Sequence, residues 1–411
     1  MKRGSMTHVV SVGCYLPPWC HAARRVKGPD EDALTMAVAA GRAADAGASA
    51  RRVVLVSRDF PLLEGGNGAV LLAALSLAAD IPVAEVLGGA PAVLDQITNA
   101  TPGTLVIAAD DNDVSVGAAA VLTGEGESTL VPVGRQTRSL PLMARGDDGV
   151  RHAYPDSRLQ REVGIRATLD KLGLTGTPKA VAFAGVPVGQ LGRAIDTSGA
   201  AEEPQASAAG VVRAIADAIE RGACGLVFAA EQSTMSVAVL NGNESPPKIN
   251  RDEAPPRELP ATKIADGVGI PISMPAYARA FEPKIRWEAA VFDERPGIDT
   301  APQFPPRVRV DNSGALAADY RLEPLPRTGS VYTHTTIRIP VPDLPSPYSL
   351  AVVQLDDSVV RVLMKVTGVP AGEATIGQAG SVVLRKIATR AGVPDYGYAF
   401  WPGRVNEGVQ A

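Results

Sequence analysis

Thiols and imidazoles are the side chains that could attack a carbonyl, move a proton or bind a metal, and this chain has three cysteines and four histidines. Cys20 and His21 are adjacent and could form a metal site or a reactive pair. Neighbours in sequence rarely point at one target, so we do not expect them to share a site. Cys14 ends a β-branched run and is interpreted as a small buried apolar residue. Cys224 precedes an apolar run and is predicted to lie in the core.

Two of the histidines are candidates for proton transfer or ligand contact. His152 stands in a polar segment ahead of a predicted helix, where it could act as a displaced general base. We favour a surface loop histidine there. His334 alternates with threonines in a predicted strand and could face a ligand groove, although a solvated strand face is the preferred interpretation.

Acidic, glycine-rich and basic runs suggest three further sites, each with a simpler structural interpretation. Residues 110–113 (DDND) could bind a cation but lack the Gly and Glu of a calcium loop, so we prefer a solvated turn with helix-capping acids. Residues 65–68 (GGNG) open a predicted helix like a phosphate cradle, without the Lys–Ser/Thr of a P-loop. The cations Arg24, Arg25 and Lys27 could contact the phosphates of a ligand, but a solvated loop is favoured.

Composition limits the class of protein. The 411 residues are 45% hydrophobic and 20% charged, which is typical of an ordinary globular chain. A net charge of −4 and only 4% aromatic residues argue against nucleic-acid binding. Three scattered cysteines cannot form a disulfide framework. No apolar run suits a signal peptide or a membrane span, so we expect a cytoplasmic protein.

The pattern of apolar residues divides the chain into two regions of different fold class. Residues 7–240 alternate apolar runs with Ala-rich amphipathic stretches, which predicts layered α/β packing on a mostly parallel sheet whose strand–helix order could be duplicated. Residues 241–261 are polar and proline-rich, as in a linker. Residues 275–290 could form one or two helices. Four later β-rich runs (331–339, 348–355, 359–366 and 381–384) predict a small antiparallel barrel or sandwich.

The first region resembles the thiolase superfamily, in particular its hydroxymethylglutaryl-CoA synthase-like branch. The resemblance is carried by residues 10–17 (VSVGCYLP), 28–32 (GPDED), 35–37 (TMA) and 117–124 (GAAAVLTG). It implies a shortened α/β thiolase-like layered domain over residues 1–242. Such enzymes acylate a cysteine at the N-terminus of a buried helix and use a nearby histidine. By resemblance the cysteine would fall at or beside Gly89 and the histidine at Ala184 or Gly185, so the resemblance implies that both catalytic residues are missing.

The second region resembles the OB-fold acyl-CoA-associated domain that partners thiolases. The matching text is residues 304–307 (FPPR), 329–333 (GSVYT), 347–348 (PY) and 351–355 (AVVQL). The resemblance implies a linker over 243–270, a helical and degenerate zinc-ribbon segment over 271–315, and an OB-fold domain over 316–411. Zinc ligands would lie near four positions, and no cysteine follows Cys224, so no zinc is expected. Those positions are Pro296, Asp299, Val310 and Ser313.

These resemblances imply a thiolase-like, OB-fused accessory subunit that binds or channels an acyl-CoA. We expect no catalytic residue, no metal and no covalently bound cofactor; CoA or acyl-CoA is a possible ligand. The expected partner is a thiolase-like subunit in a homo- or hetero-oligomer, with the apolar helix of residues 69–79 suited to the interface. One alternative is a CoA-dependent acyltransferase or retro-aldol lyase that uses His152, His334, Tyr154 or Asp110. Oligonucleotide binding by the barrel is a third.

Overall fold

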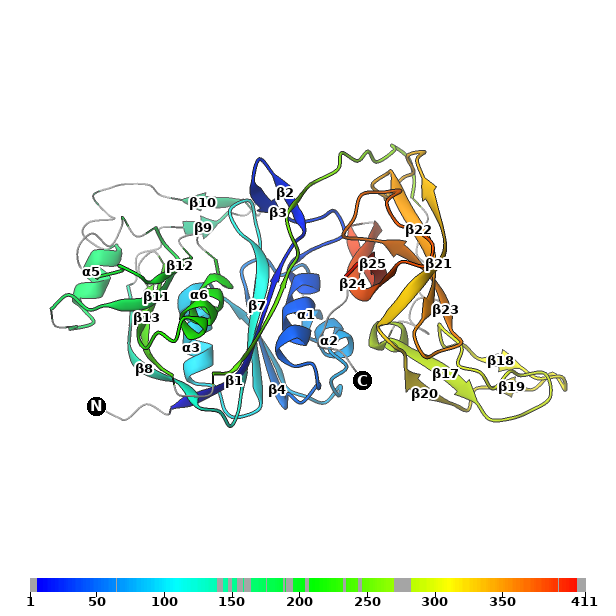
Figure 1. Ribbon diagram of the computed structural model, residues 1–411, viewed down its shortest axis with the longest axis horizontal. Coiled ribbons are helices and arrows are strands. Elements are labelled where there is room, and N and C mark those ends of the chain that lie inside the picture. The colour runs from blue at the N-terminus through cyan, green and yellow to red at the C-terminus, as the bar shows by residue number, and fades with distance from the viewer. Residues whose placement is uncertain are drawn as a thin grey trace. The chain divides into compact units, whose positions relative to one another are not determined.

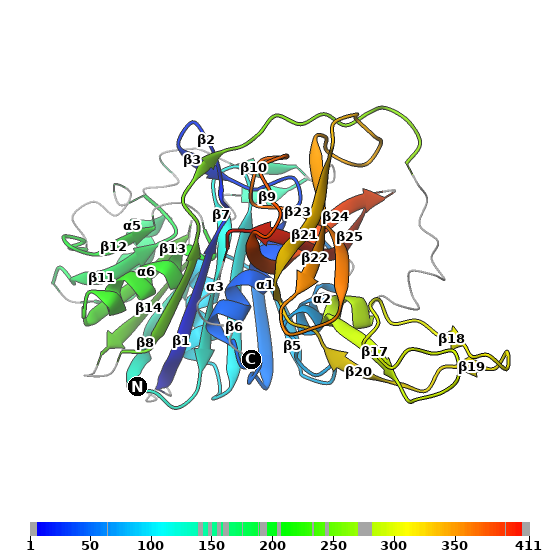
Figure 2. The same ribbon diagram turned by 45° about the vertical axis from the view of Figure 1, so that its right-hand side comes forward.

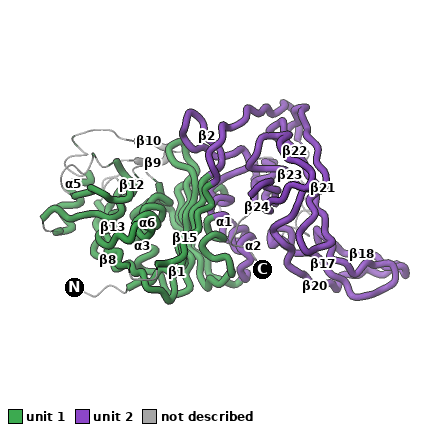
Figure 3. Tube along the Cα trace, viewed as in Figure 1, with its two compact units in different colours: residues 1–16, 40–63, 80–253 green, residues 17–39, 64–79, 254–411 purple. Residues whose placement is uncertain are grey.

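A computed structural model describes most of the chain and divides it into two compact units (Figure 3). The described residues are 6–63, 65–138, 143–146, 150–153, 158, 164–174, 176–187, 189, 195–203, 207–231, 234–242, 246–269, 282–390 and 392–404. The first unit comprises residues 1–16, 40–63 and 80–253, and the second comprises 17–39, 64–79 and 254–411. Among the described residues no helix is long and apolar enough to cross a membrane.

The first unit is built on a mixed sheet of eleven strands. Ten of them lie in the order β12-β11-β13-β14-β8-β1-β7-β6-β4-β5, and β15 pairs with β1 outside that path. Five of the neighbouring pairs are parallel and five are antiparallel, so the expectation of a mostly parallel sheet is wrong. The strands are β1 (Thr7–Leu16), β4 (Arg52–Ser57), β5 (Val83–Leu87), β6 (Thr104–Asp111), β7 (Val116–Thr123), β8 (Ser128–Thr137), β11 (Ala180–Ala184), β12 (Ala201–Glu203), β13 (Gly225–Glu231), β14 (Thr234–Asn241) and β15 (Lys248–Glu253).

The strand order of this sheet is duplicated. In chain order β1, β4, β5, β6 and β7 lie in space as β5-β4-β6-β7-β1. The later strands β8, β11, β12, β13 and β14 repeat that arrangement as β12-β11-β13-β14-β8, with the same parallel and antiparallel pairings. The duplication that the strand–helix order suggested is therefore present, although the sequence shows no simple repeat.

Two helices form a buried layer between the halves of this sheet. Helix α3 (Ala90–Thr98) contacts strands of both halves, and so does α6 (Gly210–Glu220) (Figures 1 and 2). Nearly every residue of α6 is buried, which its run of Val, Ala and Ile permits. Helix α1 (Ala33–Ala44) lies close to β1, where a side chain at Gly13 would collide with the backbone of residues 40–44. Helix α5 (Ile165–Asp170) and the short pair β9 (Met143–Arg145) and β10 (Arg151–Ala153) complete this unit.

The segment expected to be a linker contributes to the sheet. Residues of β15 pair in parallel with β1 from Ser11 to Leu16, so 248–253 belong to the α/β unit. The linker was predicted from the proline-rich composition of the whole segment. The six residues of β15 themselves contain no proline, so they can pair in a sheet. The remainder of that segment includes β16 (Arg257–Glu258), which pairs with β2 (Trp19–His21).

The second unit contains a closed five-stranded barrel. Its strands follow the order β21-β22-β23-β25-β24, and all neighbours are antiparallel except β23 and β25. The strands are β21 (Thr328–Ile337), β22 (Tyr348–Leu355), β23 (Arg361–Val366), β24 (Ala379–Arg390) and β25 (Val393–Pro402). Closure satisfies the edges that a small open sheet would expose. The prediction of a small β-barrel is confirmed.

Shorter elements of the second unit differ from the expectation. Residues 282–286 are helical but β17 (Glu288–Phe292) is a strand, so the helices expected over 275–290 are wrong in their last part; 275–281 lie outside the described residues. Strand β17 pairs with β20 (Tyr320–Pro324), and β18 (Arg309–Val310) with β19 (Leu316–Ala317) (Figure 2). The strand β3 (Arg24–Val26) pairs with β2. Helix α2 (Asn67–Ala74) is buried on nearly all sides, so it offers no exposed apolar face to a partner.

Candidate functional site

The N-terminus of helix α3 is the place where the sequence predicted a missing cysteine. Gly89 caps this helix and is buried, with Pro91 in the first turn. A Cβ atom at residue 89 would lie 2.5 and 2.6 Å from the carboxylate oxygens of Glu231. Glu231 ends strand β13, is 8% exposed, and forms an ion pair with Arg58. A carboxylate therefore occupies the space into which a cysteine side chain would project.

Polar side chains surround this point at the carboxyl ends of the parallel strands β4 and β6. The Ser57 hydroxyl donates to the Ala109 carbonyl at 2.8 Å and accepts from the Asp59 amide at 2.9 Å. The Asp59 carboxylate accepts from the amide of Asp111 and the side chain of Asn112, both at 3.1 Å. Ligands of α/β proteins bind at such strand ends. Arg58 and Glu231 are not predictable from the sequence, because only the fold brings them together across 173 positions.

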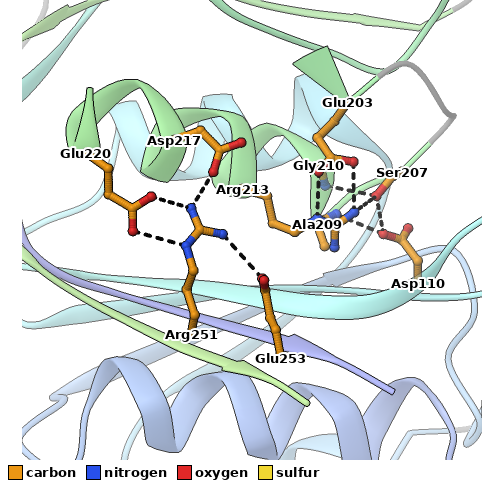
Figure 4. Close-up of polar contacts among 10 residues, drawn as sticks. All are labelled: Asp110, Glu203, Ser207, Ala209, Gly210, Arg213, Asp217, Glu220, Arg251 and Glu253. Atoms are coloured by element: carbon orange, nitrogen blue, oxygen red, sulfur yellow. Dashed lines mark hydrogen bonds and ion pairs between the residues drawn. The ribbon is translucent and has the colours of Figure 1, made fainter. Parts of the chain in front are cut away.

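A second carboxylate lies at the N-terminus of helix α6. Asp110, at the end of β6, accepts hydrogen bonds from the Ser207 hydroxyl at 2.5 Å and from the Ala209 amide at 2.9 Å (Figure 4). It also accepts from the Ala208 amide at 2.7 Å. Asp110 is 3% exposed, and burial raises the pKa of its carboxyl. The hydrogen bonds from Ser207 and the two amides lower this pKa and so oppose the effect of burial. Asp110 is thus a helix-capping acid, as expected, but it caps a distant helix and is not part of a solvated turn.

Arg213 and Arg251 pair with acidic side chains around α6. Arg213 donates to the Glu203 carboxylate at 3.1 and 3.2 Å and is 6% exposed (Figure 4). Arg251 on β15 donates to Glu220 at 2.8 and 3.0 Å and also pairs with Asp217, which ties β15 to the helix (Figure 4). Hydrogen bonding to Glu220 raises the pKa of Arg251, so its charge is permanent.

The two helix N-termini are related by the duplication. Strand β6 of the first half supplies Asp110 to α6 of the second half, and β13 of the second half supplies Glu231 to α3 of the first. A helix N-terminus attracts anions through its free amides and its dipole. In this chain each position already holds an internal carboxylate. An oxyanion from a ligand would have to displace Glu231 or Asp110 to bind there.

The expected position of the catalytic histidine has no room for an imidazole. Ala184 is fully buried. Gly185 has a φ of 109°, and a Cβ there would collide with the carbonyl oxygen of Ala230. Only glycine fits this position, and neither residue can transfer a proton.

The three cysteines have different surroundings. Cys14 is buried in the core, and burial, with Glu253 nearby, raises the pKa of its thiol to about 12. Cys20 and the exposed His21 both contact Glu258, at 3.9 and 3.1 Å, so these sequence neighbours do reach one carboxylate at the surface. Cys224 is exposed and accepts from the Gly242 amide at 3.1 Å, so its predicted core position is wrong.

The remaining candidates are distributed over both units. His152 is exposed on β10, and Tyr154 lies outside the described residues. His334, on β21, is half-buried and its Nδ1 atom has no hydrogen-bond partner within the described structure. Gly65 and Gly66 have φ values of 97° and 96° ahead of α2. In the basic cluster, Arg25 donates to the Pro17 carbonyl at 2.5 Å, and the side chains of Arg24 and Lys27 are exposed.

Turns joined by hydrogen bonds occupy the places where a zinc ribbon would carry its ligands. The Asn312 amide donates to the Pro296 carbonyl at 3.1 Å, and Arg295 pairs with Asp319 at 2.7 Å. The Asp311 carboxylate accepts from the amides of Ser313 and Ala315 at 2.8 and 3.0 Å. Of the four expected ligand positions only Asp299 carries a carboxylate. No cluster of three metal-binding side chains occurs in the part of the chain that the structure describes.

The second unit contains a cavity of about 620 Å³ beside the barrel. Its wall is largely proline and aliphatic, and its charged residues are Asp30, Asp343, Lys365 and Lys386. Cavities of about 300–1,000 Å³ with a few placed polar groups are typical of small-molecule sites. This cavity is not predictable from the sequence, because its wall comes from separate segments between Trp19 and Gly392.

Comparison with known proteins supports the two-part architecture. Residues 322–385 match the family model of the C-terminal OB-fold domain of ChsH2. None of the curated proteins matches the chain. With the layered α/β unit and the closed barrel, the predicted order of a layered α/β domain followed by an OB-fold barrel is confirmed.

Several solved structures are similar in general arrangement. The 3-oxoacyl-[acyl-carrier-protein] synthase III of Aquifex aeolicus VF5 is 16% identical, covering 57% of this chain and 99% of that chain with a TM-score of 0.47. The HMG-CoA synthase PksG of Bacillus subtilis is 14% identical over 58% of this chain and 81% of its own, with a TM-score of 0.46. An Ltp2-ChsH2(DUF35) aldolase chain is 20% identical over 31% of this chain and 93% of its own, with a TM-score of 0.24. At these values the likeness concerns fold and does not bear on activity.

Proposed function

We propose that this protein is a thiolase-like, OB-fused accessory subunit that binds or channels an acyl-CoA within a condensing, acyltransferase or thiolase complex. One observation carries the proposal: the α3 N-terminus of a thiolase-like unit holds Gly89 and the Glu231 carboxylate in place of a nucleophilic thiol. A carboxylate at that position cannot form the acyl thioester on which condensing chemistry depends. Cys14, the thiol within the thiolase-like stretch of residues 10–17, is buried, and its raised pKa keeps it protonated.

An exposed sheet edge supports assembly with a thiolase-like subunit. Strand β5 is the last strand of the sheet and pairs only with β4 among the described strands. Its Leu87 side chain is 75% exposed, which is unusual for a large apolar residue at a strand end. An open edge of this kind can pair with a strand of another chain. We infer that β5, and not the helix predicted over residues 69–79, forms the surface that contacts the partner.

The proposal is tested by purifying the complex and determining its mass. The full chain is purified from its host at native expression, and the complex is weighed by native mass spectrometry. A stoichiometric assembly with a cysteine-bearing thiolase homologue is expected, and the variant Leu87→Asp should dissociate it, whereas Ile264→Asp, at another exposed apolar residue in the second unit, should not. A monomer that binds no acyl-CoA would contradict the proposal.

Glu231 favours one alternative function, a retro-aldol lyase acting on a β-hydroxyacyl-CoA. In that reaction a general base removes the hydroxyl proton as the carbon–carbon bond breaks. A buried carboxylate paired with Arg58 could accept this proton. Turnover of a β-hydroxyacyl-CoA by the isolated chain, lost in Glu231→Gln and retained in Asp110→Asn, would establish the lyase and remove the accessory role.

A further inference from the structure

The cavity of the second unit has a cation with no acidic partner. Lys365, at the end of β23, donates from Nζ to the Ile387 carbonyl at 2.6 Å and lies 5.2 Å from the centre of the Tyr348 ring. Ile387 is the extra residue of an irregularity in the pairing of β24 with β25, which leaves its carbonyl free to accept this bond. Within the described chain no carboxylate lies within 4 Å of the Lys365 amine.

The acidic side chains that line the cavity, Asp30 and Asp343, lie close to groups other than Lys365. Asp30 lies 3.9 Å from Arg385, whose guanidinium is also 3.3 Å from Glu31. The carboxylate of Asp343 lies against the backbone at Gly269. Burial lowers the pKa of Lys365, while Asp30 and Asp395 oppose the shift.

The rest of the wall defines what a ligand would have to be. Pro260, Ile264, Pro347, Val366 and Val369 present apolar surface, which an aliphatic or alicyclic body would cover. A buried cation gains most from an anion that enters with it, because desolvation strengthens the pair. Lys386 adds a second positive charge to the same wall.

We propose that this cavity binds a carboxylic acid with an apolar body, and that Lys365 pairs with its carboxylate. The site is independent of the proposed acyl-CoA function, since it requires neither the α3 N-terminus nor a partner chain. The occupant is a free acid small enough for about 620 Å³. Lys365 is the residue that distinguishes an acid from a neutral molecule of the same shape.

Calorimetric titration of the full chain with decanoate and with decanol tests this site. Decanoate should bind at least about tenfold more tightly than decanol to the unaltered protein. Lys365→Met should remove that preference while leaving decanol within about twofold, because the apolar wall remains. Lys179→Met, at an exposed lysine of the first unit that does not line the cavity, is the control and should retain the preference. Equal binding of the two ligands, or no binding of either, would overturn the proposal.

A labelling measurement on the unaltered protein covers the case in which Lys365→Met does not fold. Decanoate should slow acetylation of Lys365 at least about tenfold and leave Lys179 unchanged. Unchanged acetylation of Lys365 would overturn the site. Acyl-CoA binding, measured in parallel on the same sample, reports on the proposed function separately.

Discussion

At the scale of single residues, burial decides which side chains remain reactive. Cys14, which lies within residues 10–17, is fully buried, whereas Cys224 is exposed. A thiolate is the reactive species, and desolvation disfavours it. The sequence predicted the burial of Cys14 from its β-branched neighbours. The sequence misplaced Cys224, because an apolar run predicts the burial of its own residues and not of the residue that precedes it.

Cys14 should therefore resist alkylation in the folded protein. With a pKa of about 12, a fraction on the order of 10⁻⁴ is ionised at pH 8. Iodoacetamide at pH 8 is expected to modify Cys224 and to spare Cys14 until denaturant is added, as read by peptide mass mapping. Modification of Cys14 at the rate of Cys224 under native conditions would show that the core is open there.

The carboxyl of Asp110 gives a prediction about pH. Its pKa is raised by burial, so the folded state holds this proton more tightly than the unfolded state does. Its contribution to the free energy of unfolding must then fall as pH rises from about 4 toward neutrality. Urea unfolding of the unaltered protein and of Asp110→Asn, compared at pH 4 and pH 7, should show the difference between them shifting in favour of Asp110→Asn at the higher pH. A shift of opposite sign would mean that the amides and Arg213 outweigh desolvation.

At the scale of elements, the N-terminus of α3 is the decisive feature. A side chain at residue 89 and the carboxylate of Glu231 compete for one space. Gly89→Ala should destabilise the protein by about 1–3 kcal/mol through overpacking. Adding Glu231→Ala should recover at least half of that cost in a double-mutant cycle measured by urea unfolding. Additive costs would show that residue 89 and Glu231 do not share the space.

Sequence patterns predicted the elements better than their pairings. The four β-rich runs predicted for the second region overlap β21, β22, β23 and β24, whereas β25 was not predicted. The absence of a nucleophile at residue 89 stays what the resemblance implies. The incorporation of β15 and the capping of α6 by Asp110 depend on contacts between residues more than 90 positions apart. Local periodicity carries no information on such contacts. The Arg58–Glu231 pair and the cavity around Lys365 escaped prediction for the same reason.

At the scale of the whole molecule, each unit has its own polar anchor. Asp110 caps α6 in the first unit, and Arg385, only 1% exposed, pairs with the buried Glu31 in the second. Removing one partner of a buried ion pair costs about 3–5 kcal/mol. Calorimetry of Arg385→Met is expected to lower the transition of the second unit, while Asp110→Ala lowers that of the first. A single transition moved equally by both substitutions would show one cooperative unit.

The proposed function requires this chain to hold an acyl-CoA without becoming acylated. The most direct measurement is the intact mass of the purified protein with acetyl-CoA, recorded first under native and then under denaturing conditions. The account predicts the added mass of acetyl-CoA in the native spectrum and the unmodified polypeptide after denaturation. An acetyl group that persists after denaturation and maps to a cysteine would contradict it, because the chain would then carry the nucleophile that Gly89 and Glu231 exclude.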